Sequence, residues 1–231
     1  MPKNIASLFS GCGGLDLGFS GGFVFRNTVC ERLDTNIVFA NDFDRDAWAC
    51  YNNNELLTND GVHSRLGDIR EIPTNEIPNF DILLAGFPCQ PFSNAGNRKG
   101  VHDDNGRGTL FEECERIIRE KIEVGHRPEA FLFENVRGIL SSKMQDGVTT
   151  VPDEIHKRME NLGYQVSMKL VCSSDYGVPQ RRYRVLIVGI DATLGVGAFD
   201  FDRLKEVIQE YNIPSEHFGQ DEELLLGRIL Q

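Results

Sequence analysis

Cys89 is the residue of this chain whose neighbours best suit a nucleophile. It lies in the segment Ala-Gly-Phe-Pro-Cys-Gln-Pro-Phe-Ser, residues 85–93, directly after an apolar run, and Pro88 and Pro91 restrict its backbone. Side chains that follow a central strand of a parallel sheet gather at the edge where active sites form. A thiol there is nucleophilic if nearby cations or N–H groups lower its pKa. The other cysteines are expected to be small buried apolar residues: Cys12, Cys30, Cys50, Cys114 and Cys172.

Glu134 is the candidate acid. It follows the apolar segment Ala-Phe-Leu-Phe, residues 130–133, and precedes Asn135. Burial beside these residues would raise the pKa of Glu134 towards the range useful for proton donation, although a salt-bridged or helix-capping acid is the alternative. A thiolate and a carboxyl group at adjacent strand ends indicate addition to a polarised double bond.

Arginines are concentrated in the segment Gln-Arg-Arg-Tyr-Arg, residues 180–184. Arg182 and Arg184 share a face if this segment enters a strand, because side chains alternate with a period of two. Their guanidinium forks suit phosphate oxygens or a carbonyl oxygen. A solvated surface is the alternative, but three arginines within four residues of an acidic chain favour a functional role.

A glycine-rich loop follows the first apolar run, as Phe-Ser-Gly-Cys-Gly-Gly-Leu-Asp-Leu-Gly-Phe over residues 9–19. Such a loop lets a ligand approach the free N–H groups of a helix N-terminus. Asp16 stands where a dinucleotide fingerprint needs its third glycine, and the chain lacks the GK[ST] of a P-loop and the GxSxG of a nucleophile elbow. A cofactor with a small carboxylate, such as S-adenosylmethionine, remains, and a purely structural tight turn is the alternative.

Two acids follow the next expected strands. Asp42 comes at the end of an apolar run, where doubly wound folds hold ribose hydroxyls, and Phe43 beside it could cover an adenine face. Asp68, in Gly-Asp-Ile, could accept a hydrogen bond from an adenine amino group. Each acid alone is more often a helix cap or a turn residue. The glycine-rich loop and these two acids, in this order along the chain, together support one cofactor site.

The elements that must position these residues alternate along the chain. Apolar runs at 5–9, 37–40, 81–85, 130–133 and 185–188 predict buried strands. Residues 44–53, 110–121 and 152–162 predict helices. This alternation predicts an α/β fold with a doubly wound, mostly parallel sheet, Rossmann-like in arrangement. The polar stretch 86–110 is long for a loop in a compact domain, so we expect it to be functional or disordered.

Composition limits the classes of protein that this chain could belong to. The 231 residues carry 24 basic and 35 acidic side chains, a net charge of −11, so any nucleic-acid face must be local. With 40% hydrophobic and 26% charged residues the composition is that of a globular protein, and no apolar run is long enough for a membrane span or a secretory signal. Cysteines without a CxxC pair fit a reducing cytoplasm. We expect no metal ion.

The C-terminal part differs in composition. Residues 200–231 contain eight acids and three bases and end on the apolar stretches 224–226 and 229–230. A terminal helix packed on the sheet and a docking segment for something further are both open. We expect residues 1–190 to form the catalytic domain and 191–231 an acidic extension.

Six motifs, taken together, resemble the cytosine carbon-5 DNA methyltransferases of bacteria and phages. They are FSGCGGLDLGF, NDFD, GDI, GFPCQPFS, ENVRG and YGVPQRRYR, and the similarity covers about residues 5–190. The resemblance implies the S-adenosylmethionine-dependent methyltransferase fold, duplex DNA as substrate, and a target cytosine that is flipped out of the helix.

Roles carried over from the family are as follows. Cys89 attacks carbon 6 of cytosine, Glu134 binds ring N3, Arg184 binds the base carbonyl, and Arg182 supports the loop or the DNA backbone. Asp42 binds the ribose of S-adenosylmethionine. The remaining cofactor contacts implied are Phe9, Ser10, Gly11, Cys12, Gly13, Gly14 and Leu15 for the methionine part, Phe43, Asp68 and Ile69 for the adenine, and Pro88 and Leu110 in the same pocket.

The chain also departs from the family pattern. Asp42 and Phe43 stand where glutamate and tryptophan are common, which we expect to tune cofactor affinity. No target-recognition domain and neither of the last two motifs is recognisable after Gly189. The sequence therefore resembles a catalytic half: a natural subunit that needs a complementary chain, a truncated frame or an expression fragment.

Three other functions compete with this reading. A transfer-RNA cytosine methyltransferase shares the same chemistry and motifs. A non-catalytic S-adenosylmethionine-binding subunit is disfavoured by the intact Cys89, Glu134 and arginines, and a nicotinamide oxidoreductase by Asp16.

Overall fold

The computed structural model describes residues 1–25, 28–58, 61–88, 110–144, 146–176, 178 and 180–203. Cys89, the candidate nucleophile, lies outside the described residues, as do most of the predicted loop over 86–110 and the acidic tail beyond residue 203. The predictions for the apolar stretches 224–226 and 229–230 also fall outside them. The expected division at residue 190 stays a prediction.

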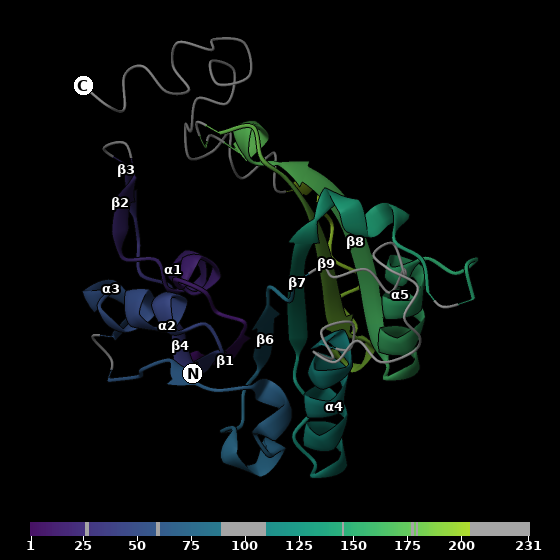
Figure 1. The fold of residues 1–231 in the computed structure, drawn as a ribbon, viewed down its shortest axis with the longest axis horizontal. Helices are drawn as coiled ribbons and strands as arrows, with labels where there is room; N and C mark the ends of the chain where they lie inside the picture. Colours follow the sequence, from purple (N-terminus) through teal and green to yellow (C-terminus); the bar gives the residue numbers. More distant parts are fainter. Residues whose placement is uncertain are drawn as a thin grey trace.

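A seven-stranded sheet forms the centre of the molecule, in the order β5-β4-β1-β6-β7-β9-β8 (Figure 1). The first five of these run parallel, and β9 runs antiparallel to both β7 and β8. The fold class predicted from the sequence, doubly wound and mostly parallel, is confirmed. The strands are β1 (Lys3–Leu8), β4 (Thr35–Asp42), β5 (Arg65–Leu66), β6 (Ile82–Ala85), β7 (Ala130–Val136), β8 (Tyr164–Cys172) and β9 (Tyr183–Asp191).

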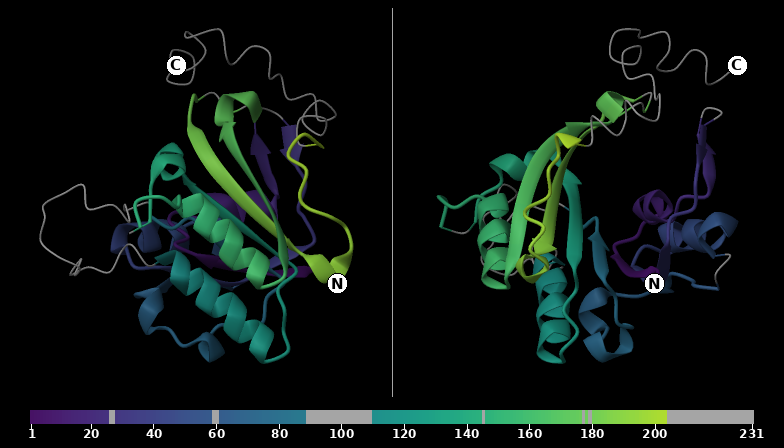
Figure 2. Two further views of the ribbon diagram at one scale, coloured as in Figure 1. Left: turned by 90° about the vertical axis from the view of Figure 1, so that its right-hand side faces the viewer. Right: turned by 180° about the vertical axis from the view of Figure 1, so that it is seen from behind.

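Helices cover both faces of this sheet, as two views of the ribbon show (Figure 2). One side carries α1 (Gly14–Ser20), α2 (Arg45–Asn52) and α3 (Glu55–Thr58), and the other carries α4 (Leu110–Glu123) and α5 (Val151–Asn161). Alternation along β1 supplies both cores, because Ile5 packs towards the first group while Ala6 and Leu8 pack towards the second.

The predicted helices begin where their sequences provide caps. Asp44 accepts hydrogen bonds from the N–H groups of Asp46 and Ala47, so α2 begins at Arg45. Thr150 accepts from the N–H of Asp153 in the same way at the start of α5. All three predicted helices and all five predicted strands are present, with ends displaced by a few residues.

Several elements were not predicted. A two-stranded antiparallel hairpin, β2 (Phe23–Phe25) with β3 (Thr28–Cys30), stands apart from the sheet (Figure 1). Strand β8 was missed because it lies at the sheet edge and its polar and apolar residues do not form a buried run. The short 3₁₀ turns were not predicted either: η1 (Ile69–Glu71), η2 (Thr74–Glu76), η4 (Arg137–Ser141), η5 (Ser173–Tyr176) and η6 (Ala192–Leu194).

Two features bear on the expectations from composition. Within the described part of the chain, no helix combines the length and apolar character needed to cross a membrane. The expectation of buried cysteines holds for Cys114 and Cys172 but is wrong for Cys12 and Cys50, which are exposed, and Cys30 is intermediate.

Candidate active site

The glycine loop crosses the carboxyl end of β1 and is tied to the end of β4. The N–H of Ser10 donates to the carbonyl of Asn41 (3.0 Å), and the N–H of Gly11 donates to Asp42 Oδ2 (2.8 Å). Phe9, Gly11 and Gly13 have positive φ values of 54°, 56° and 82°. The loop therefore turns sharply into α1, which begins at the next glycine.

Asp16, in α1, joins the elements on either side of the glycine loop. Its side chain is fully buried and accepts hydrogen bonds from Ser7 Oγ (2.5 Å) and Tyr51 OH (2.7 Å), which joins β1, α1 and α2. Burial raises the pKa of Asp16, while the two hydroxyl donors act in the opposite direction. From sequence this acid served only to exclude a dinucleotide site, and its structural role was missed. A single acid within the apolar stretch Leu15–Phe19 was the available signal.

Asp42 and Phe43 stand together at the edge of the sheet beside the loop. The Asp42 carboxylate is 7% exposed and accepts from the N–H groups of Gly11 and Asp44 (2.9 Å). A carboxylate has about four acceptor positions, so it retains capacity for a further donor. Phe43 is 59% exposed, which leaves its ring available for stacking.

Asp68 reaches the same edge through β5. The register pairs Asp42 with Leu66, and the N–H of Gly67 donates to the Asp42 carbonyl (3.0 Å), so the two acids follow neighbouring strands. The Asp68 carboxylate caps η1 and forms an ion pair with Arg70 (2.5 Å, Oδ2 to Nη2). Its hydrogen bond with Arg70 lowers the pKa of Asp68.

Open space lies over this edge. A Cβ atom built on Gly11, Gly14 or Gly67 would meet no other atom within 4 Å. The carboxylates of Asp42 and Asp68, which can accept from hydroxyl or amino groups, and the exposed ring of Phe43 border that space and fit S-adenosylmethionine. Of the other predicted contacts, Pro88 is exposed, whereas the side chains of Ile69 and Leu110 are buried.

Cys12 projects from the glycine loop towards α2. The neighbouring Cys50 thiol on α2 raises the pKa of Cys12. A raised pKa disfavours the thiolate, so Cys12 is a poor competitor for the role of nucleophile.

The segment that leads to Cys89 is held against the end of β7. Strands β6 and β7 are parallel neighbours, with Ala85 paired to Phe133. The buried side chain of Asn135 donates to the carbonyl of Phe87 (3.0 Å), and a Cβ on Gly86 would lie 3.7 Å from Glu134 Oε2. The strand ends that carry the predicted thiol and carboxyl are therefore adjacent. Asn135 was missed as a positioning residue, although a polar side chain inside a buried strand signalled it.

Glu134 and Arg184 form an ion pair across β7 and β9, with Arg184 Nε 2.5 Å from Glu134 Oε1. From Nη1 the guanidinium donates a hydrogen bond to the Tyr183 carbonyl (2.8 Å). Side-chain exposures are 28% for Glu134 and 20% for Arg184. The expected burial of Glu134 among apolar residues is therefore wrong, because alternation along β7 places Glu134 on the half-exposed face, opposite the buried Phe133 and Asn135.

Arg182 lies just before β9 and its side chain is exposed. Its backbone is fixed by Ser173, whose N–H donates to the Arg182 carbonyl (2.9 Å) and whose Oγ accepts from the Arg182 N–H (3.2 Å). Because the strand begins at Tyr183, the shared face predicted for Arg182 and Arg184 stays a prediction.

The fold is similar to that of solved methyltransferases. The structure resembles the crystal structure of S. pombe Dnmt2 methyltransferase, with a TM-score of 0.61, 24% identity, and coverage of 81% of this chain and 50% of that one. It also resembles Entamoeba histolytica methyltransferase EhMeth, with a TM-score of 0.59, 19% identity, and coverage of 82% of this chain and 53% of that one.

The sequence comparison defines the family. Residues 3–229 match the C-5 cytosine-specific DNA methylase family, and the chain belongs to it. The chain is 40% identical over 212 residues to Type II methyltransferase M.BanI of Aneurinibacillus aneurinilyticus, covering 89% of this chain and 44% of that protein. It is 38% identical over 200 residues to Type II methyltransferase M.FnuDI of Fusobacterium nucleatum, covering 85% and 49%. The chain thus spans about half the length of these relatives.

Proposed function

We propose that this chain is the catalytic part of a methyltransferase that acts on carbon 5 of cytosine in duplex DNA. The observation that carries the proposal is the Glu134–Arg184 pair, which lies beside the strand end leading to Cys89. A carboxylate, a guanidinium and a thiol at neighbouring strand ends can together hold and activate a pyrimidine ring.

S-adenosylmethionine is the proposed cofactor and supplies an electrophilic methyl group. The backbone of residues 9–15 holds its methionine part, Asp42 accepts from the ribose hydroxyls, and Phe43, Asp68 and Ile69 contact the adenine. Pro88 and Leu110 line the remainder. The open space over Gly11, Gly14 and Gly67 supports this assignment.

Chemistry on a base requires that the base leave the helical stack. Cys89 then adds through its sulfur to carbon 6, which turns carbon 5 into a nucleophile. Carbon 5 takes the methyl group, and the carbon–sulfur bond of the donor breaks to leave S-adenosylhomocysteine. Loss of the proton from carbon 5 restores the ring double bond as the carbon 6–sulfur bond breaks and the Cys89 thiolate is freed.

Glu134 and Arg184 act on the charge that develops in the ring during this addition. Glu134 binds or protonates ring N3, and Arg184 donates to the base carbonyl. The ion pair between them aligns both groups before substrate arrives, so little reorganisation is needed. Arg182, exposed next to this pair, contacts the loop or the DNA backbone.

The proposed partners follow from the charge of the chain. A net charge of −11 makes a broad DNA-binding surface on this chain unfavourable. We infer that a further region or a complementary chain carries the target-recognition contacts. The relatives named Type II methyltransferases suggest a restriction-modification system, and the cytoplasm stays the predicted location.

Transfer of tritiated methyl from S-adenosylmethionine to mixed-sequence duplex DNA tests the proposal. We expect label in 5-methylcytosine with the unmodified chain and with Cys30→Ala, and none with Cys89→Ala. Label in transfer RNA but not in duplex DNA would mean that transfer RNA is the substrate. Equal label with Cys89→Ala would remove the nucleophile assignment.

A further inference from the structure

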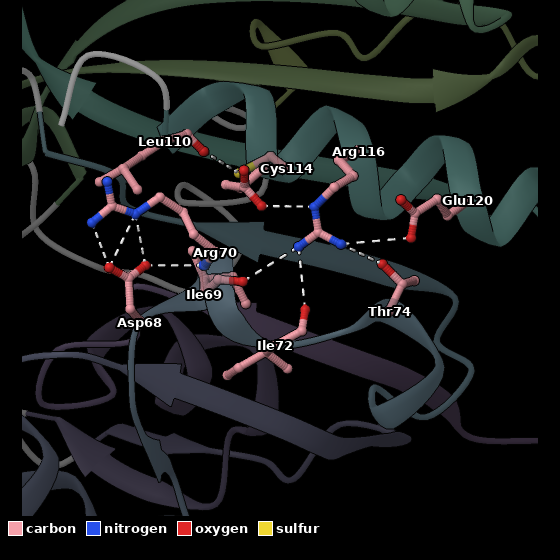
Figure 3. A network of polar contacts seen from close by, with 10 residues as sticks. Asp68, Ile69, Arg70, Ile72, Thr74, Leu110, Cys114, Arg116 and Glu120 are labelled. Atoms are coloured by element: carbon pink, nitrogen blue, oxygen red, sulfur yellow. Dashed lines mark hydrogen bonds and ion pairs between the residues drawn. The ribbon is translucent and has the colours of Figure 1, made fainter. Parts of the chain in front are cut away.

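Arg116 projects from α4 to the turn that follows Asp68, and its guanidinium contacts groups from three parts of that turn (Figure 3). Nη1 donates to Thr74 Oγ1 (2.8 Å). Nη2 donates to the carbonyls of Ile69 and Ile72, each at 3.3 Å. No sequence motif pointed to this arginine.

The contacts use most of the donors that a guanidinium has. Nε donates to Glu113 Oε2 (2.7 Å), and Glu120 lies 3.5 Å from Nη1. An arginine presents five N–H donors in a rigid planar fork, so one side chain can hold an acid and two backbone carbonyls at once. A lysine has three donors on one nitrogen and cannot reproduce this arrangement.

The turn that Arg116 holds is the one that presents Asp68. The Asp68 side chain caps η1 by accepting from the N–H of Arg70, and Ile69 is the first residue of η1. The side chains of Ile69, Ile72 and Thr74 are all buried, at 2%, 3% and 6% exposure. The Ile69 carbonyl, directly after Asp68, therefore has its position set from α4.

Helix α4 connects this turn to another part of the same site. It begins at Leu110, a proposed pocket residue, and the side chain of Arg116 spans from the helix to the turn. We propose that Arg116 is a positioning residue for cofactor recognition, which aligns Asp68 and Ile69 with the adenine of S-adenosylmethionine. This inference rests on the proposed function.

Arg70 does not perform this role. It contacts the Asp68 carboxylate itself, at 3.0 Å from Nε to both oxygens, and its side chain is 40% exposed. An exposed ion pair contributes little to the conformation of a turn. Arg116 is only 23% exposed and contacts the backbone of the turn, so the position of Asp68 depends on it more strongly.

The test measures binding of two ligands by calorimetry: S-adenosylhomocysteine and its inosine analogue, in which a carbonyl oxygen replaces the adenine amino group. Asp68 accepts from that amino group, so the unmodified chain should prefer the adenine ligand. Arg116→Met should weaken adenine-ligand binding about tenfold and weaken analogue binding much less. Preference for adenine should therefore fall, and Arg116→Lys should restore only part of it.

Arg119→Met is the matched control, because Arg119 lies on the same helix and its ion pair among the described residues is with Glu115 of that helix, at 3.8 Å. It should leave both affinities unchanged. Thr74→Val removes one contact without changing the size of the side chain, and should lower the adenine preference in the same direction if Arg116→Met does not fold.

Two results would overturn the inference in different ways. Equal weakening of both ligands by Arg116→Met and by Thr74→Val would indicate general loosening of the fold, and would leave the proposed function intact. Failure of the unmodified chain to bind either ligand would remove the proposed function, and the role of Arg116 with it.

Discussion

Arg184 Nε lies 2.5 Å from Glu134 Oε1, and the two residues are brought together by antiparallel pairing of β7 with β9. The register places Val136 opposite Arg184 and Leu186 opposite Glu134, so the ion pair is diagonal across the two strands. Strand pairing thus aligns the acid and the arginine. The second carboxylate oxygen of Glu134 faces the strand end at Gly86.

Glu134→Gln should lower kcat for methyl transfer by about 10²-fold or more, because an amide cannot give a proton to ring N3 as charge develops there during addition. Glu129→Gln is the matched control. It alters an acid that pairs with Lys3 at the opposite end of the sheet, and kcat should not change. Initial rates at saturating cofactor and DNA measure the effect. An unchanged kcat for Glu134→Gln would remove this residue from the reaction.

Gly13→Ala should destabilise the protein by about 2 kcal/mol or more. Its φ is 82°, and a Cβ there would lie 2.2 Å from Leu57 Cδ1 and 3.0 Å from the Tyr51 ring. Gly18→Ala is the contrast, because it is helical with open space around the Cβ position, and it should stabilise by about 0.5–1 kcal/mol. Urea unfolding compares the two. Equal midpoints would mean that the loop is not packed against α2 and α3.

Asp16→Asn should change how stability depends on pH. The unfolded carboxyl ionises near its ordinary pKa of 3.8, whereas burial raises the pKa of Asp16 in the native state. Between those two values the native state binds more protons, so the free energy of unfolding of the unmodified protein falls as pH rises above about 4. Asparagine cannot ionise, so the variant should gain relative stability over that range.

Urea unfolding at a series of pH values measures this difference. Asp34→Asn, an exposed acid between β3 and β4, serves as the control and should leave the curve unchanged. A pH profile of Asp16→Asn parallel to that of the unmodified protein would show that the native carboxyl ionises normally.

Asp42→Asn should weaken S-adenosylhomocysteine binding by about tenfold. The carboxylate accepts from the N–H groups of both Gly11 and Asp44 and is the proposed ribose acceptor, and an amide offers only one oxygen for these donors. Asp44→Asn is a close control, because asparagine caps a helix as well as aspartate does. Similar affinities for both variants would mean that a residue other than Asp42 accepts from the ribose.

The order of the main elements could be predicted from sequence because each buried strand is a short apolar run. The runs that became β1, β4, β6, β7 and β9 were all identified; Asp42 is the last residue of β4, and Asp68 lies just after β5. Parallel strands align their carboxyl ends at one edge, so the meeting of these acids follows from simple topology.

Contacts that depend on register and on side-chain partners could not be predicted. The pairing of Glu134 with Arg184 requires that β9 lie antiparallel beside β7, which no local pattern specifies. Asp16 beneath the loop and Arg116 against the turn are likewise paired with residues distant in sequence. Edge strand β8 carries no continuous apolar run; its signal is the alternation of apolar and polar residues from Tyr164 to Leu170, which the predicted runs did not include.

Trapping of the covalent adduct tests the central claim most directly. In duplex DNA that carries 5-fluorocytosine, fluorine replaces the hydrogen that must leave carbon 5, so elimination is blocked and the enzyme stays attached after methyl transfer. We predict a denaturant-stable protein–DNA complex that requires S-adenosylmethionine, with Cys89 as the attached residue in peptide mass spectrometry. Attachment at another cysteine, or no adduct from protein that binds both cofactor and DNA, would contradict the account.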